Sequence, residues 1–285
     1  MPVGSGSHRY ERVQGWPQLP ADIYLGWIGS VGVDSQGRVY CFCRGTHPMV
    51  VFDADGRVVD TWGDDLLNHA HGVYVDADEH LWLTDRYAHV VWVTTTEGQV
   101  VRRIGYPNFT SAAGGLFNHP TNTHLGADGS IYVSDGYGDT RCHRFAPSGQ
   151  LLNSWGEPGT GPGQFDLPHG IWALSNDRIL VADRENHRIQ IFDPDGVYID
   201  QWTGFRQPSD FYVDEDAGVI YLAEVGGRVS ILDLTGRIIT SWEDPGDGGA
   251  TFSAPHGIWV DPEGAIYMGE VQRDDALYKF QPINR

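Results

Sequence analysis

A unit of four short, apolar segments recurs six times along the chain, at intervals of roughly 40 to 50 residues. The second segment of each copy is the clearest: Val39–Phe42, Leu81–Thr84, Ile131–Ser134, Ile179–Ala182, Ile220–Ala223 and Ile266–Gly269. Segments this short and rich in β-branched residues favour strands, and no long apolar stripe with a helical period accompanies them. Four strands per copy at this spacing are typical of propeller blades. The sequence therefore predicts an all-β fold, a six-bladed β-propeller.

The two ends of the chain indicate how the ring closes. The last copy stops at Tyr278–Pro282 without a fourth strand, whereas His8–Trp16 at the N-terminus is a strand-like segment outside any copy. It ends on tryptophan, as do the fourth segments of other copies, for example at Trp62 and Trp155. We expect residues 1–20 to supply the outer strand of the last blade, within a single propeller domain of residues 1–285.

Composition restricts the partners and the cellular compartment that we expect for the protein. The net charge is −19, from 38 acidic and 19 basic residues, so neither a nucleic acid nor an anionic membrane is expected as a partner. No apolar run is long enough to span a membrane, and Met1–Pro20 lacks the apolar core of a signal peptide. Three cysteines do not suggest a disulfide framework, and we expect Cys41 and Cys43 to be buried thiols. These features predict a cytoplasmic protein; nothing in them indicates a protein partner.

Histidine fills one slot of the repeat in every second copy. The three are His71, His169 and His256, and the same slot holds Gly29, Thr121 and Ser209 in the other copies. Alternate blades of a six-membered ring stand about 120° apart, and the first strand of each blade lines the central channel. The three imidazoles should therefore converge. Three histidines with one open position are typical of catalytic zinc, although iron, cobalt and manganese also accept imidazole.

Other histidines are less tied to the repeat. Four fall at or near the expected mouth of the channel and are secondary candidates: His69, His119, His124 and His143. Four more fall in turns or outer strands, where we expect ordinary surface groups: His47, His80, His89 and His187.

A second set of candidates follows the second strand in the first four copies: Arg44, Arg86, Tyr137 and Arg184. These turns should share one rim of the ring. Arginine there could bind a carboxylate through two N–H donors, and tyrosine near a cation could transfer a proton. The alternative is that Asp-Arg pairs such as Asp85-Arg86 only close turns, which we favour for Arg86 taken alone.

Several runs together resemble a known family: Ser134–Tyr137, Ser148–Gln150, Ser154–Gly156, Pro162–Phe165, Pro168-His169 and Val181–Gln190. They are similar to peptidyl-α-hydroxyglycine α-amidating lyase, a six-bladed propeller of NHL repeats. The resemblance covers residues 28–280 in architecture and is densest between 131 and 192.

The resemblance implies that His71, His169 and His256 bind zinc. It also implies a reaction in which the C–N bond of a carbinolamide breaks to give an amide and glyoxylate. The family has acidic residues near a structural calcium ion where this chain has Gly257 and Asn122, so these positions do not favour calcium.

The same resemblance implies that Tyr137 is the catalytic tyrosine and that Arg44 and Arg184 are active-site arginines. Arg86 is a further candidate for binding substrate. Without a signal peptide, a small α-hydroxy acid or amide fits better than a secreted peptide.

Two other functions stay open. One is a metal-dependent hydrolase or lactonase that uses metal-bound water; six-bladed lactonases usually bind calcium through Glu, Asp and Asn, whereas this chain has histidine in those slots. The other is a non-catalytic NHL module that binds a protein at its rim.

Overall fold

The computed structural model describes residues 1–244, 246 and 251–283 and contains six blade-like antiparallel sheets. In each sheet the strands lie side by side in chain order, apart from the last sheet, which also takes strands from the N-terminus. The fold is an all-β, six-bladed β-propeller, as the repeat predicts. No helix in the described part of the chain has the length and apolarity needed to cross a bilayer.

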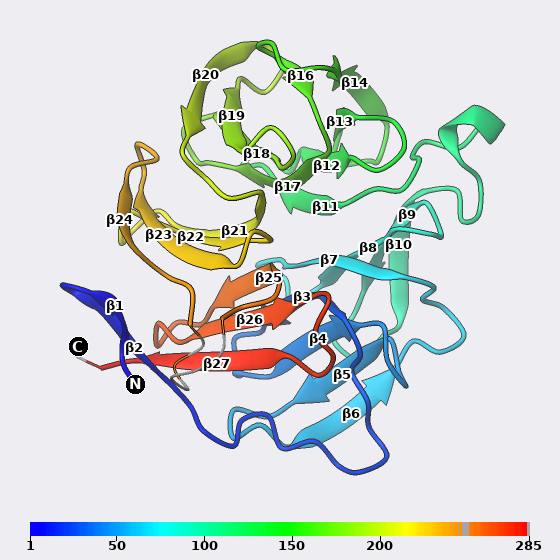
Figure 1. Ribbon diagram of the computed structural model, residues 1–285. Helices are drawn as coiled ribbons and strands as arrows, with labels where there is room; N and C mark the ends of the chain where they lie inside the picture. The colour runs from blue at the N-terminus through cyan, green and yellow to red at the C-terminus, as the bar shows by residue number, and fades with distance from the viewer. Residues whose placement is uncertain (245, 247–250, 284–285) are drawn as a thin grey trace. The chain divides into compact units, whose positions relative to one another are not determined.

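The chain consists of two compact units, each defined by its own backbone contacts. The second unit, Leu67–Pro208, contains three sheets that run from cyan to yellow-green in Figure 1. They are β7 (Ala70–Val75), β8 (Leu81–Asp85), β9 (Val90–Thr94) and β10 (Val100–Gly105); β11 (Asn122–Leu125), β12 (Ile131–Asp135), β13 (Arg141–Phe145) and β14 (Leu151–Trp155); and β17 (Pro168–Ala173), β18 (Ile179–Asp183), β19 (Arg188–Phe192) and β20 (Tyr198–Thr203).

Three short elements connect the sheets of this unit: the 3₁₀ helix η1 (Ser111–Ala113), and the parallel pair β15 (Glu157–Pro158) and β16 (Gln164–Phe165). Strand β11 contacts both β7 and β17, so the middle sheet packs between the other two.

The first unit combines Met1–Leu66 with Ser209–Arg285. Its sheets are β3 (Ile28–Val33), β4 (Val39–Cys43), β5 (Met49–Phe52) and β6 (Val58–Trp62); β21 (Pro208–Asp214), β22 (Val219–Glu224), β23 (Arg228–Asp233) and β24 (Ile238–Trp242); and β25 (Pro255–Val260), β26 (Ile266–Glu270), β27 (Leu277–Pro282), β2 (His8–Arg12) and β1 (Val3–Ser5). Strand β25 contacts β3 and β22.

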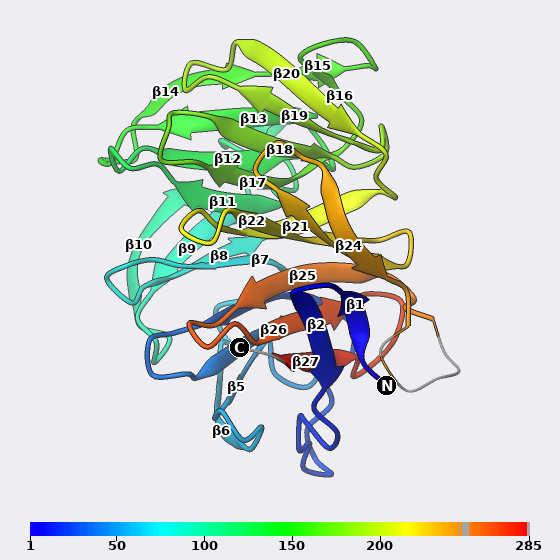
Figure 2. The same cartoon turned by 90° about the vertical axis from the view of Figure 1, so that its left-hand side faces the viewer.

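The N-terminal strand completes the last sheet. Strand β2 pairs antiparallel with β27, with Glu11 opposite Gln281 (Figure 2), which confirms the closing strand expected from the sequence. The strand ends at Arg12 rather than at Trp16, whose indole instead packs against Phe52 and Tyr267. Strand β1 adds a fifth strand that the repeat did not predict.

Burial follows the position of a strand within its sheet. Strands β8, β9, β18 and β19 are buried along their whole length. The outer strands β6 and β20 contain only half-buried and exposed residues. Continuous apolar runs suit strands covered on both faces by packed sheets. All three cysteines are buried free thiols, as expected for Cys41 and Cys43.

Candidate active site

A break in strand register places each of the three repeated histidines. In β7 the pairing with β8 shifts between Ala70 and Gly72, so His71 has no residue opposite it. His169 and His256 occupy the same slot of β17 and β25, where the register also shifts. A β-bulge frees one residue from the ladder and turns its side chain in a new direction. The register also shifts in β3, between Ile28 and Ser30, so this irregularity belongs to the slot and not to the histidine alone.

Backbone carbonyl groups fix how two of these rings are protonated. Nδ1 of His71 lies 2.6 Å from the carbonyl oxygen of Thr121, and Nδ1 of His256 lies 2.6 Å from that of Gly29. A carbonyl oxygen can only accept, so Nδ1 must donate in both pairs. The neutral ring then carries its lone pair on Nε2, the orientation found in metal-ligating histidines.

The glycine after His71 and the one after His256 leave room for these contacts. A Cβ on Gly72 would lie 2.8 Å from the Thr121 carbonyl oxygen and from Oδ1 of Asn122. On Gly257 it would lie 2.4 Å from Cα of Ser30. Any larger residue would push the adjacent strand away, and the imidazole would lose its carbonyl partner.

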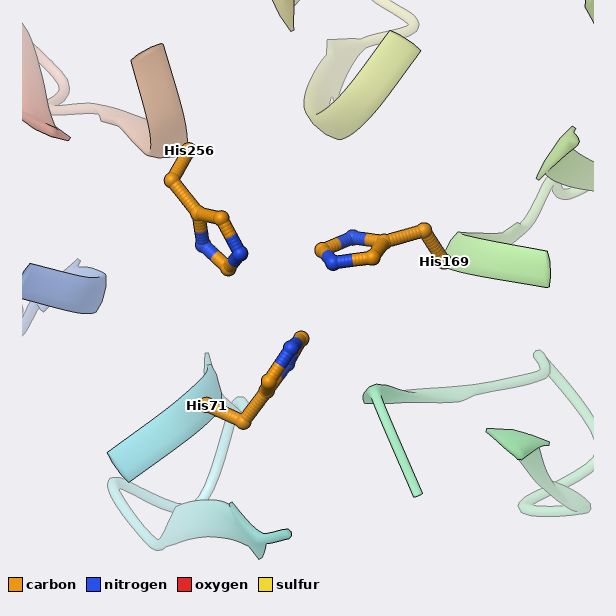
Figure 3. A group of neighbouring side chains, drawn as sticks. All are labelled: His71, His169 and His256. Atoms are coloured by element: carbon orange, nitrogen blue, oxygen red, sulfur yellow. The ribbon is translucent and has the colours of Figure 1, made fainter. Parts of the chain in front are cut away.

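The structure brings the three histidines together. His71, His169 and His256 are all buried, and each offers a ring nitrogen within 4.8 Å of the other two, so the group could hold a metal ion. Figure 3 shows the three rings pointing toward one another. It is the one group of three or more His, Cys, Asp or Glu side chains of this kind among the described residues.

Tyr137 lies against two of these rings. Its hydroxyl oxygen is 3.3 Å from Nε2 of His71 and 3.5 Å from Nε2 of His169, whose ring centroids are 4.7 Å apart. Arg184 donates to the same hydroxyl from Nη1 at 3.2 Å. Within the second unit, the predicted tyrosine, one predicted arginine and two of the histidines thus form one site.

Arg86 also reaches this site, through the face of the tyrosine. Its Cζ lies 3.5 Å from the centroid of the Tyr137 ring, within the range of a cation–π contact. Arg184 is already engaged, because Nε donates to Glu185 at 2.8 Å. The Nε of Arg86 is buried and has no hydrogen-bond partner in the described structure.

The turn beside Arg86 does not depend on its guanidinium. Asp85 closes it by accepting hydrogen bonds from the backbone N–H groups of Asn68, His69 and Ala88. The side chain of Arg86 is therefore available to Tyr137, and the turn-closing role considered from the sequence belongs to the aspartate. The sequence contains one feature that sets Arg86 apart from Arg44 and Arg184, the aromatic residue Tyr87 directly after it.

Arg44 belongs to the first unit. Its backbone N–H donates to the carbonyl of Trp27 at 2.9 Å, and its guanidinium lies 6.0 Å from the centroid of the Trp27 ring. The role that the resemblance implies for Arg44 stays a prediction.

Two of the secondary histidines belong to the packing. His124 lies between Tyr74 and Trp172, with ring centroids 4.4 and 3.9 Å away, and burial lowers its pKa to about 3. Nδ1 of His143 lies 2.7 Å from the hydroxyl oxygen of Ser154.

One expectation about surface histidines is wrong. His89 is buried, and its Nδ1 accepts the backbone N–H of His119 at 3.1 Å. His187 is exposed, whereas His47 and His80 are half-buried. His89 and His187 share a left-handed backbone conformation, with φ 56° and 55°, so this conformation does not decide which of the two is buried.

Comparison with known proteins places this fold and site in a class. The NHL repeat family model matches residues 165–192. NHL repeat-containing protein 3 of Homo sapiens is 30% identical over 292 residues, covering 95% of this chain and 83% of that protein. The chain belongs to the family of NHL repeat-containing protein 3.

A second relative and a solved structure are more distant. Peptidyl-alpha-hydroxyglycine alpha-amidating lyase 1 of Drosophila melanogaster is 26% identical, covering 93% of this chain but 58% of its own length. The chain thus spans a little over half of that relative. A gluconolactonase structure from Xanthomonas campestris aligns with a TM-score of 0.70 at 15% identity, covering 98% of this chain and 94% of that one. At this identity the likeness concerns the fold alone.

Proposed function

We propose that this protein is a metal-dependent lyase that cleaves the C–N bond of a small N-acyl-α-hydroxyglycine. The observation that carries the proposal is the position of the Tyr137 hydroxyl, 3.3 and 3.5 Å from Nε2 of His71 and His169 and 3.2 Å from the Arg184 guanidinium. An acid–base group, nitrogen ligands and a cation within hydrogen-bond distance suit proton transfer at a substrate oxygen. Relatives named as amidating lyases support the same reaction.

The donor set fits a divalent transition metal, with zinc as the first candidate. His71, His169 and His256 would hold it through imidazole nitrogens, and the second hydrogen bond from Nδ1 of His71 and His256 already orients two of the rings. When bound, such a cation polarises a coordinated hydroxyl group and lowers its pKa. Calcium is not part of the proposal, because Gly257 has no side-chain oxygen to offer.

Arginine residues would hold the substrate carboxylate. Arg86 has guanidinium donors left over beside Tyr137, and Arg184 approaches the same hydroxyl. Two parallel N–H donors match the two oxygens of a carboxylate. Arg44 is a third candidate through the family resemblance only.

Every proton in the proposed cleavage is accounted for when Tyr137 relays it. The α-hydroxyl group of the substrate loses its proton, its C–O bond becomes the carbonyl of glyoxylate, and the C–N bond breaks with the electron pair going to nitrogen. The phenol of Tyr137 gives its proton to that nitrogen and regains one from the hydroxyl. The products are an amide and glyoxylate, with no oxidant or co-reactant.

Metal content and product release together test the proposal. The purified protein, loaded with zinc, would be assayed for bound metal by mass spectrometry and for glyoxylate from α-hydroxyhippurate. We expect one equivalent of metal and stoichiometric glyoxylate and benzamide. Bound metal without glyoxylate would favour the hydrolase or lactonase alternative, tested next with lactone substrates. Absence of metal binding would favour the interaction module.

A further inference from the structure

Four ring side chains lie together next to Arg86 in the second unit. His69 precedes β7, Tyr87 and His89 lie in the turn after β8, and His119 precedes β11. The ring centroids are 4.0 Å apart for His69 and Tyr87, 5.7 Å for Tyr87 and His119, and 4.5 Å for His119 and His89. We call these four residues the rim cluster.

Backbone contacts fix the rim cluster. Asp85 accepts the backbone N–H of His69 at 3.0 Å, and the backbone N–H of Arg86 donates to the carbonyl of His69 at 3.1 Å. His89 and His119 both adopt left-handed backbone conformations, with φ 56° and 68°. Non-glycine residues in this region cost free energy, so tertiary contacts must hold them there. The backbone that carries the rim cluster is therefore held in place by the fold.

Arg86 joins the rim cluster to the candidate active site. Its Cζ lies 5.2 Å from the centroid of the Tyr87 ring and 3.5 Å from that of Tyr137. Contacts therefore run without interruption from Tyr137 through Arg86 to Tyr87. A substrate whose reacting carbon lies at Tyr137 would extend its remaining group along this path.

The rings of the rim cluster pack edge to face or at a tilt, with interplanar angles of 39° for His69 and Tyr87, 83° for Tyr87 and His119, and 75° for His119 and His89. Burial, and then the positive charges of His89 and Arg86, lower the pKa of His119, and burial lowers the pKa of His89. Burial therefore favours the uncharged form of both imidazoles. Tyr87 is 46% exposed despite its size, so one large aromatic ring of the cluster faces solvent. An exposed aromatic ring offers an apolar, planar group a partner for stacking.

We propose that the rim cluster is an acyl subsite that selects an aromatic acyl group, with Tyr87 as the residue against which this group stacks. The proposal rests on the proposed function for the identity of the substrate, an N-acyl-α-hydroxyglycine, but not for the binding itself. N-aroyl substrates should bind more tightly than N-acetyl substrates that carry the same carboxylate.

Unreactive glycine conjugates test the subsite without turnover. N-benzoylglycine and N-acetylglycine share the amide and carboxylate and lack the α-hydroxyl group, so neither can be cleaved. Titration calorimetry on the zinc-loaded protein should give a Kd about tenfold lower for the benzoyl compound, the size expected for one aromatic contact with its buried area. Tyr87→Ala should abolish this preference, and Tyr87→Phe should keep it.

Phe109→Ala is the matched control. Phe109 is 55% exposed on the connection that also carries His119, and no ring contact joins it to the rim cluster. This variant should keep the preference. The subsite is overturned if wild-type protein binds both compounds equally, fails to bind the benzoyl compound, or keeps its preference in a folded Tyr87→Ala variant. Loss of glyoxylate release with an intact preference would instead overturn the proposed function and leave the subsite standing.

Discussion

The hydroxyl group of Tyr137 lies 3.3 Å from Nε2 of His71, the nitrogen that carries the lone pair of the ring when Nδ1 donates to the Thr121 carbonyl. A phenol at this distance can exchange a proton with a substrate oxygen held at the same nitrogen ligands. Metal binding and proton transfer therefore depend on different atoms, and substitutions should separate them.

His169→Ala should lose the metal, whereas Tyr137→Phe should keep it and lose turnover. The first removes a nitrogen ligand, and the second removes only the hydroxyl group. The loss in kcat for Tyr137→Phe should be about 10² to 10⁴, the range for general acid–base groups. Metal analysis and glyoxylate assay of both variants provide the check. Retention of a full equivalent of zinc by His169→Ala would exclude this residue from the ligand set.

The two arginines beside Tyr137 should affect different kinetic constants. Arg184 donates to the Tyr137 hydroxyl, so Arg184→Met should lower kcat. Arg86 contacts Tyr137 through the ring face and has a buried Nε without a hydrogen-bond partner in the described structure, so Arg86→Met should raise KM, by about 10- to 100-fold for a lost charge-assisted hydrogen bond. Steady-state kinetics on α-hydroxyhippurate measure both. Equal effects of the two variants on KM would mean that the guanidinium groups share the carboxylate.

Gly72→Ala should weaken metal binding without touching a ligand. The added Cβ would lie 2.8 Å from the Thr121 carbonyl oxygen, the partner of His71 Nδ1. Disturbing such a hydrogen bond typically costs about 10- to 100-fold in metal affinity. Competition with a chelating dye gives the affinity. Gly114→Ala is the control: its φ is 88° and no atom lies within 4 Å, so it should cost about 1 kcal/mol of stability and bind metal normally.

His124 should make the protein less stable in mild acid. Burial lowers its pKa to about 3 in the folded protein, against about 6.5 in the unfolded chain. Below pH 6.5 the unfolded chain binds one more proton at this residue, so its contribution to the free energy of unfolding falls by about 1.4 kcal/mol per pH unit. His124→Asn keeps an acceptor for the Ala173 N–H and removes the titration. Urea unfolding between pH 5 and 7 should show a shallower dependence in this variant, and parallel curves would contradict the assignment.

Short apolar segments and a repeated slot were enough to predict the blades, the closing strand and the meeting of three histidines. These features depend on periodicity, which a sequence displays directly. The contact of Arg86 with Tyr137 and the burial of His89 depend on what surrounds these side chains in the folded chain. Neither leaves a periodic trace, so both required the structure. The bulge at His71 lies between these two cases. The sequence shows the His-Gly pair, but only the structure shows that the strand register shifts there.

The pairing of β2 with β27 has a consequence for synthesis of the chain. Residues 8–12 leave the ribosome long before residues 277–282, with which their backbone groups pair. Contacts across such a span slow folding and expose unpaired edges in the meantime. Assembly of the last blade is thus the folding step at which a nascent chain would most need a chaperone.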